Sequence, residues 1–298
     1  MSNTNSALCS HLFAVSGSGK TRLALEGLCL NWGFYISCGT DPQKVGSCDF
    51  HLATDLIKSR NNWDGASGSD PNNTKSVNVA NHTFMMLICA RIFVLKQLLQ
   101  NLPSGANGTQ ARKRWVLIQA LPPFNNAQDD IFSAVLRSLW AADTSSMHLH
   151  IVTMLEEIRR TVGNDIFPKG RFFTVVDEAQ VAAEYLTNSF RSFTTGIDKH
   201  PVLHAFHRFL STIPYIHGVI LAGTGLSKKM VQTALSSRAA LHIHERPKPI
   251  VFVEVGRFTK DGRAHEDYIR KHLPLSSKST SDQRLVDRIL HWFSGRWV

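Results

Sequence analysis

Short apolar runs alternate with amphipathic stretches along the first 227 residues. The runs predict buried strands, and apolar residues spaced three or four positions apart predict helices. This alternation favours an α/β fold with a mainly parallel sheet. The strand-like segments span 12–15, 32–38, 115–120, 171–180 and 216–227, and the helices span 20–31, 76–102, 129–140, 147–162 and 200–213. In the first helix, the expected core positions are Leu23, Leu25, Leu28 and Leu30.

The remaining segments predict loops and a change of organisation near the C-terminus. Residues 39–76 are rich in Gly, Ser, Asn and Asp and predict a loop or insertion, and residues 104–114 predict another loop. From residue 228 the pattern changes to short segments, including "PIVFVEVGRF" at 249–258. We therefore expect a core at 1–227 and a smaller subdomain at 228–298.

One loop after the first predicted strand resembles a phosphate-binding loop. The usual pattern is G-x-x-x-x-G-K-[ST], and this chain has "AVSGSGKT" from Ala14 to Thr21. Alanine in place of the first glycine costs about 1 kcal/mol at most and removes no donor or charge. The backbone N–H groups and the start of the next helix would cradle an anion. The expected nucleotide-binding residues are Ser16, Gly17, Ser18, Gly19, Lys20, Thr21 and Arg22.

The lysine and threonine of this loop have predicted roles of their own. Lys20 would contact the β- and γ-phosphates, and the Thr21 hydroxyl would bind Mg²⁺. A second motif, "FFTVVDEAQ", ends a buried strand with Asp177 and Glu178. The first carboxylate would hold Mg²⁺ and the second would polarise the attacking water. An exposed acidic pair at the end of a strand is the plain structural alternative.

A third motif follows a later strand. In "VILAGTGLS", the strand ends at glycines that flank Thr224. We expect Thr224 to sense the γ-phosphate, and the alternative is a Gly-Thr-Gly turn without a ligand. An arginine that stabilises transition-state charge is not evident, although Arg208, Arg238 and Arg296 are all open to that role.

The charge of the chain is uneven. Its 298 residues carry a formal net charge of +10, and residues 228–298 hold 14 basic and 7 acidic side chains. This basic segment suggests an acidic partner, with nucleic acid the obvious candidate. A generally basic, solvated surface is the interpretation that we favour, because the longest basic run is "RKR" at 112–114.

Other side chains argue against several protein classes. Five irregularly spaced cysteines indicate neither a disulfide framework nor a zinc site. His200, His204 and His207 are spaced to share a helix face but lack the partners of a metal motif. The N-terminus does not resemble a signal peptide. The apolar stretch 84–95 contains Arg91 and is shorter than the about 20 residues a bilayer requires, so it predicts a buried helix and an intracellular protein of the cytoplasm or nucleus without a membrane span.

Taken in order, these motifs resemble the P-loop NTPase module of Crinkler-type proteins, which is related to retrotransposon-hot-spot proteins and to AAA+-like and signalling ATPases. The likeness includes "SGSGKTRLALEGLCLNWGFYIS", "FTVVDEAQ", "ILAGTGLS" and "RILHWFSGR". It implies a three-layer NTPase core followed by a small C-terminal helical lid. His200 and His204 stand where relatives are expected to have arginines, and the chain ends where relatives continue into a further helix.

The expected function is Mg²⁺-dependent hydrolysis of ATP, or of GTP, coupled to a conformational change between core and lid. Glu178, Lys20 and Thr224 would serve catalysis, and Thr21 and Asp177 would hold the metal. Oligomerisation, as in related ATPases, stays open. The alternative is a nucleotide-binding scaffold that does not hydrolyse ATP and contacts nucleic acid or protein through its basic C-terminal part. A third reading is a chain that no longer folds fully.

Overall fold

The computed structural model describes twelve segments of the chain. They are residues 8–13, 19–39, 45–60, 74–123, 130–140, 147–167, 172–191, 199–224, 250–252, 266–267, 270 and 279–293. The side chains of residues 8–13, 74, 191, 250–252 and 289–293 are outside this description, so only their backbone enters the account.

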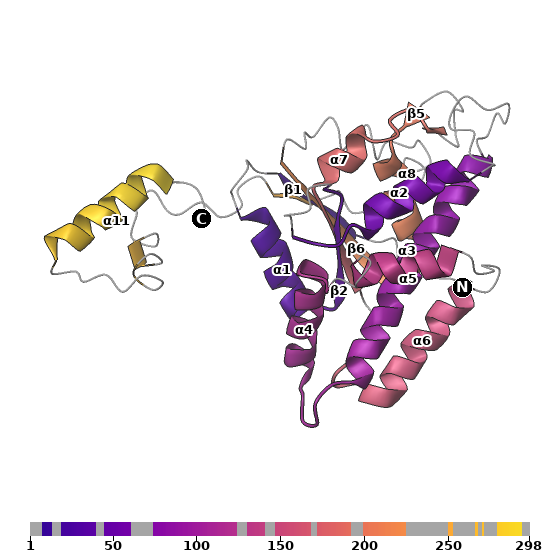
Figure 1. Ribbon diagram of the computed structural model, residues 1–298, viewed down its shortest axis with the longest axis horizontal. Coiled ribbons are helices and arrows are strands. Elements are labelled where there is room, and N and C mark those ends of the chain that lie inside the picture. Colours follow the sequence, from indigo (N-terminus) through magenta and orange to yellow (C-terminus); the bar gives the residue numbers. More distant parts are fainter. Residues whose placement is uncertain are drawn as a thin grey trace.

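Helices and strands alternate along most of this described chain, as the sequence predicts. Figure 1 shows most of the strands near the centre of the α/β body, with helices on either side. The elements are β1 (Leu8–Phe13), α1 (Lys20–Leu30), β2 (Gly33–Ser37), α2 (Asp49–Ser59), α3 (Thr74–Gln100), α4 (Gly108–Ala120), α5 (Ile131–Trp140), α6 (Met147–Val162), β3 (Phe172–Asp177), α7 (Ala179–Glu184), β4 (Phe190–Arg191), β5 (Lys199–His200), α8 (Val202–Thr212), β6 (Ile216–Gly223), β7 (Ile250–Phe252) and α11 (Thr280–Phe293).

Five strands form one sheet in the order β2-β3-β6-β1-β7. All four strand pairs are parallel, which confirms the predicted α/β fold with a parallel sheet. In the register, Phe13 at the end of β1 pairs with Gly223 of β6, and Ser37 of β2 pairs with Asp177 of β3. The carboxyl ends of the strands therefore meet at one edge of the sheet.

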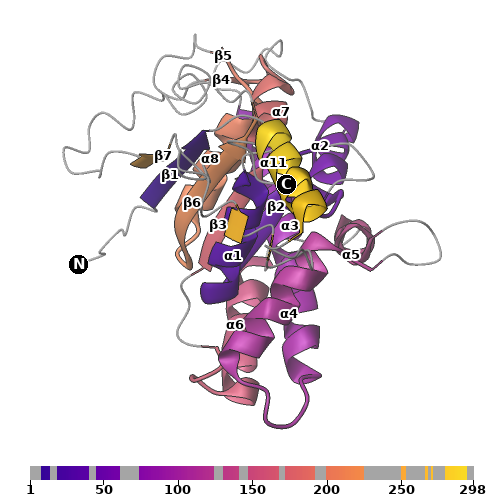
Figure 2. The same ribbon diagram turned by 90° about the vertical axis from the view of Figure 1, so that its left-hand side faces the viewer.

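The two faces of the sheet are covered by different helices. Tyr35 and Val175 pack with Ala24 and Leu28 of α1 and with Val116 of α4. The larger cluster on the other face includes aromatic side chains of β2 and β3 together with residues of α2, α3 and α8. Figure 2 shows α1 and α4 together on the face nearest the viewer. Alternating strand side chains point to opposite faces, which is why a sheet buried on both sides needs apolar residues at nearly every position.

The free edge of β2 is closed by side chains from helices. Arg91 Nη1 donates to the Tyr35 carbonyl at 2.7 Å, and the Tyr35 N–H donates to Gln119 Oε1 at 2.9 Å. Trp115 Nε1 donates to the Gly33 carbonyl at 2.7 Å. Arg91 is fully buried and pairs with Asp49 through two 2.8 Å contacts. These bonds satisfy an edge that would otherwise pair with another strand.

The prediction of a strand at 115–120, with a loop at 104–114, is wrong. Both segments contribute to α4, a helix that begins at Gly108. Asn107 caps this helix by accepting from the Gln110 N–H at 2.9 Å, and Gln110 Oε1 accepts in return from the Asn107 N–H at 3.2 Å. This capping box starts the helix within the predicted loop, and the apolar run that begins at Trp115 continues it.

Two further expectations near the N-terminus need correction. The region 39–76 contains the helix α2 and the start of α3, so it is not a continuous loop. In α1, Leu23 is 46% exposed and Leu30 is 73% exposed, whereas Leu28 is 3% exposed. The buried face consists of Ala24 and Leu28, which are four residues apart, and positions 23 and 30 lie on another side of the helix.

The predicted buried helix around Arg91 is confirmed as part of α3. Its span Lys75–Gln100 is long and apolar enough for a membrane by length and composition, but 67% of its most apolar window is buried inside the protein. The burial of Arg91 against Asp49 supports the role of a core helix. Cys29, Cys38 and Cys89, whose side chains lie in the described part, are free thiols. The same part contains no cluster of His, Cys, Asp and Glu suited to a metal ion.

The C-terminal segment contributes to the core. Ile250–Phe252 falls within the range 228–298 that we assigned to a second subdomain, yet it pairs with β1 as the last strand of the main sheet. Further along, Arg270 bonds Glu266 at 2.7 Å and Gln283 at 2.7 Å, which ties α11 to the residues before it. Figure 1 shows α11 apart from the α/β body. A closing lid stays a prediction.

Candidate functional site

The candidate phosphate-binding loop joins β1 to α1. Residues 14–18, which include Ser16, Gly17 and Ser18, lie outside the described part of the chain. Gly19 is described and has φ 81°, a left-handed conformation that favours glycine. The helix starts immediately after it, at Lys20. The start of α1 therefore faces the carboxyl edge of the sheet, where an anion would meet the helix N-terminus.

Two motifs that are far apart in the sequence come into contact at this edge. The Thr21 hydroxyl donates to Asp177 Oδ2 at 2.7 Å, across 156 positions of the chain. Asp177 ends β3 and is 3% exposed. A hydroxyl and a carboxylate are oxygen ligands of the kind that Mg²⁺ prefers, with water and phosphate oxygens completing its octahedral shell. The two residues therefore fit the predicted metal site.

A third group, Tyr35, joins this pair. Its phenol donates to the same Asp177 oxygen at 2.7 Å. Tyr35 is 1% exposed, and its burial, followed by the charge of Asp177, raises the pKa of the phenol well above its usual value. The phenol therefore keeps its proton and remains a donor. Sequence reasoning missed this residue, because a tyrosine in an apolar strand carries no mark of a polar role.

Lys20 is placed close to the same carboxylates. It is 6% exposed, which is rare for a lysine. Burial lowers the pKa of its ammonium group, and the negative charges of Asp177 and Glu178 act in the opposite direction. A buried ammonium beside two carboxylates, at the start of a helix, is suited to bind a highly charged anion.

Glu178 follows Asp177 in an unusual backbone conformation. Its φ of 53° and ψ of 37° are left-handed, which is uncommon for any residue except glycine. The Glu178 N–H donates to Asp177 Oδ1 at 2.9 Å, and Gln180 Nε2 donates to Glu178 Oε2. Strained residues of this kind cluster at functional sites. Gln180, which completes "DEAQ", was not among the expected site residues.

Thr224 lies directly after β6, and it is half-buried. Since β6 pairs with β1 on one side and with β3 on the other, Thr224 follows the strand between the phosphate loop and the two carboxylates. The expected contact of Arg22 with a nucleotide stays a prediction. The Arg22 side chain is half exposed and bonds Glu26 at 2.8 Å, one turn further along α1. Arg238 and Arg296 lie outside the described residues, and Arg208 lies on α8.

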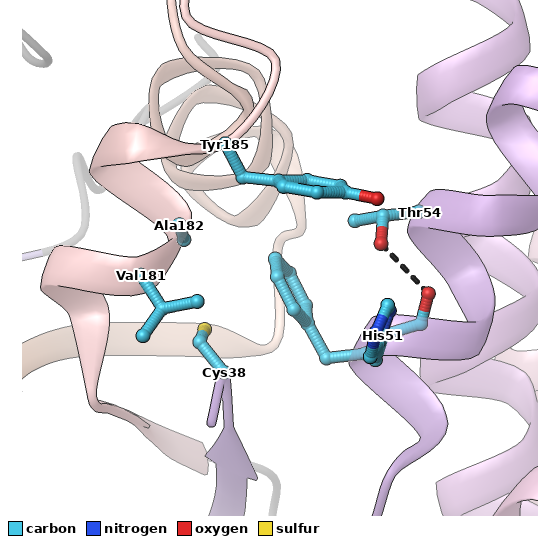
Figure 3. A pocket seen from close by; sticks show the side chains of 7 residues that line it. Cys38, His51, Thr54, Val181, Ala182 and Tyr185 are labelled. Carbon is cyan, nitrogen blue, oxygen red and sulfur yellow. Dashed lines mark hydrogen bonds between the residues drawn. The ribbon is translucent and has the colours of Figure 1, made fainter. Parts of the chain in front are cut away.

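A small, partly open hollow lies beside this site (Figure 3). Cys38 forms part of its wall, and the Cys38 N–H donates to the Asp177 carbonyl at 2.9 Å. Burial raises the pKa of the Cys38 thiol well above its usual value, so this thiol is not a reactive nucleophile. The other lining residues come from α2, α7 and the residue after α7, and they are Phe50, His51, Thr54, Val181, Ala182 and Tyr185.

The structure thus brings together Lys20, Thr21, Asp177 and Glu178, and it places Thr224 on the neighbouring strand end. The site therefore combines a hydroxyl–carboxylate contact, a buried ammonium group and a second carboxylate. No model of a known protein family matches the chain, and no curated protein matches it.

Proposed function

We propose that this protein is an ATP-binding P-loop NTPase that hydrolyses ATP with Mg²⁺. The observation that carries the proposal is the 2.7 Å contact between Thr21 and Asp177. One residue comes from the phosphate-loop motif and the other from the acidic motif, so each motif supplies the partner that the other needs. The fold places both motifs at the same edge of the sheet, on either side of β6.

Each residue at this edge has a role in that reaction. Lys20, with the N–H groups at the start of α1, neutralises negative charge on the β- and γ-phosphates. Thr21 and Asp177 would hold Mg²⁺, which would neutralise charge on the phosphate oxygens when bound. Glu178 orients a water molecule and accepts its proton as the water oxygen bonds to the γ-phosphorus. The bond from that phosphorus to the bridging oxygen breaks, and ADP and phosphate are the products.

The resemblance to Crinkler-type modules extends this proposal to the whole chain. Thr224 then senses the γ-phosphate, and hydrolysis moves the C-terminal segment relative to the core. GTP is an alternative substrate, because the residues described here contact phosphates and metal only. Base preference is tested by comparing the affinities of the two nucleotides.

A second function is favoured by the charge of the C-terminal segment. Residues 228–298 have 14 basic and 7 acidic side chains, so this part suits nucleic acid as a partner. In that case the protein binds ATP without hydrolysing it and acts as a scaffold. Tight ATP binding without phosphate release, with or without DNA or RNA, would favour the scaffold over the enzyme.

The test uses Lys20→Ala and Glu178→Gln in the full chain. We expect Lys20→Ala to abolish ATP binding in a titration, because it removes the buried cation. Glu178→Gln should keep ATP binding and lower turnover about 100-fold or more, which is the usual contribution of a general base. Lys113→Ala and Glu184→Gln are matched controls, since both side chains are exposed. Unchanged turnover in Lys20→Ala and Glu178→Gln would overturn the proposal.

A further inference from the structure

Gln180 connects the proposed catalytic glutamate to the strand end that precedes Thr224. Its amide group donates through Nε2 to Glu178 Oε2. The orientation of this amide is set by chemistry, because an ionised carboxylate only accepts hydrogen bonds. The donor side of Gln180 therefore faces Glu178, and its acceptor side faces elsewhere.

The amide oxygen of Gln180, Oε1, lies against Gly223. Gln180 Oε1 is buried and has no hydrogen-bond partner among the described residues. A Cβ atom added to Gly223 would lie only 2.2 Å from this oxygen, so a side chain at position 223 would displace the amide. Gly223 ends β6 and is followed by Thr224. The contact thus joins the end of β6 to the start of α7.

Two features of this arrangement indicate a function. A buried acceptor without a donor is disfavoured, and native structures retain few of them. Glu178 also has a left-handed backbone, with φ 53°, and such strain persists only where the surroundings hold the residue in place. The Gln180 amide is the group that holds its carboxylate. One oxygen of Glu178 is occupied by this bond, which leaves the other oxygen to accept from water.

We propose that Gln180 is a positioning residue for Glu178, and that Gly223, which has no side chain, leaves the space that the Gln180 amide occupies. The end of the strand that carries Thr224 thereby sets the orientation of the glutamate. This inference rests on the proposed NTPase activity, and it adds two residues that act through Glu178 and do not themselves touch ATP.

The experiment measures ATP affinity and single-turnover hydrolysis for Gln180→Ala, Gln180→Glu and Gly223→Ala. We expect each variant to keep the dissociation constant of ATP within about twofold and to lower the hydrolysis rate about 10- to 100-fold, which is the effect of a misplaced catalytic group. Gln180→Glu keeps the size of the side chain but loses the donor, so it provides the same test if the alanine variant does not fold. Glu184→Ala, at an exposed position of α7, is the control.

The double variant separates positioning from packing. Suppose that position 223 must be glycine only to leave room for the Gln180 amide. Gly223→Ala should then change the hydrolysis rate less than about twofold in the Gln180→Ala background, because the effects of mutating two residues in contact are not additive. If the double variant instead loses activity by the product of the two single-variant losses, the proposal is overturned. An unchanged or higher hydrolysis rate in Gln180→Ala would overturn it too. A wild-type protein that hydrolyses no ATP overturns both proposals, whereas active wild type with active Gln180→Ala overturns only the positioning role.

Discussion

Two hydroxyl groups converge on a single oxygen of Asp177. The Thr21 hydroxyl was expected here from its motif, and the Tyr35 phenol was not. Both donate to Oδ2 at 2.7 Å. A motif identifies Thr21 because its chemistry depends on local spacing, whereas Tyr35 reaches the site only through the pairing of β2 with β3. The carboxylate that we propose as a Mg²⁺ ligand is therefore held by one residue of α1 and one of β2.

Tyr35→Phe should lower the free energy of unfolding by about 2 kcal/mol, since it removes a hydrogen bond to a charged group. Urea unfolding of the two proteins at neutral pH measures the difference. The control is Tyr215→Phe, because the Tyr215 hydroxyl is buried without a hydrogen-bond partner among the described residues. Removing the Tyr215 hydroxyl should therefore lower the free energy of unfolding only slightly. Equal losses in the two variants would contradict the assignment of the Tyr35 bond.

The same comparison has a predicted pH dependence. The native structure raises the pKa of Tyr35 above its usual value near 10, so between these two values the unfolded chain releases a proton that the folded protein keeps. Stability then falls as pH rises. The advantage of wild type over Tyr35→Phe should be constant up to about pH 10 and shrink above it.

At the scale of elements, α4 shows how a helix start outweighs strand-like composition. "WVLIQA" contains β-branched and aromatic residues and suggests a strand when read by itself. The capping box at Asn107 and Gln110 begins a helix eight residues earlier. Trp115 and Gln119 then point to the free edge of β2, where both side chains bond the Gly33 carbonyl. Cap and tertiary contact together decide in favour of the helix.

Asn107→Ala should cost about 1 kcal/mol of stability, whereas Asn107→Gly should cost only a few tenths, because glycine is itself acceptable at the start of a helix. The measurement is the midpoint of denaturant unfolding with an unchanged slope. Asn164→Ala is the control, because Asn164 is an exposed asparagine after the end of α6. A glycine variant less stable than the alanine variant would contradict the capping role.

At the scale of the whole molecule, the order of strands brings the site together. β6 lies between β1 and β3, so the phosphate loop, Thr224 and the two carboxylates follow three adjacent strands. Parallel strands place all these carboxyl ends at one edge, which is where ligands bind in open α/β sheets. β7 completes the sheet beyond β1, so the core includes a strand from the basic C-terminal part of the chain.

Binding at this edge should stabilise the whole fold. At free Mg-ATP of about 100 times its dissociation constant, mass action adds about 2.7 kcal/mol, and the melting temperature should rise by on the order of 5 °C. Thermal unfolding of wild type with and without Mg-ATP measures the shift, and Lys20→Ala should show none. A chain that does not fold fully would show no cooperative transition to be shifted.

The sequence by itself determined the alternation of strands and helices, the phosphate-loop motif around Lys20 and the carboxylates at the end of β3. These depend on local periodicity and on spacing within a few residues. Only the tertiary structure decided how α4 meets the edge of β2, that Arg22 bonds Glu26, that β7 joins the main sheet, and that Tyr35 bonds Asp177 and Gln180 bonds Glu178. Some of these contacts join residues that are distant in the chain, so they depend on strand pairing. In the others a side chain has several nearby partners, and the packing around it determines which one it bonds.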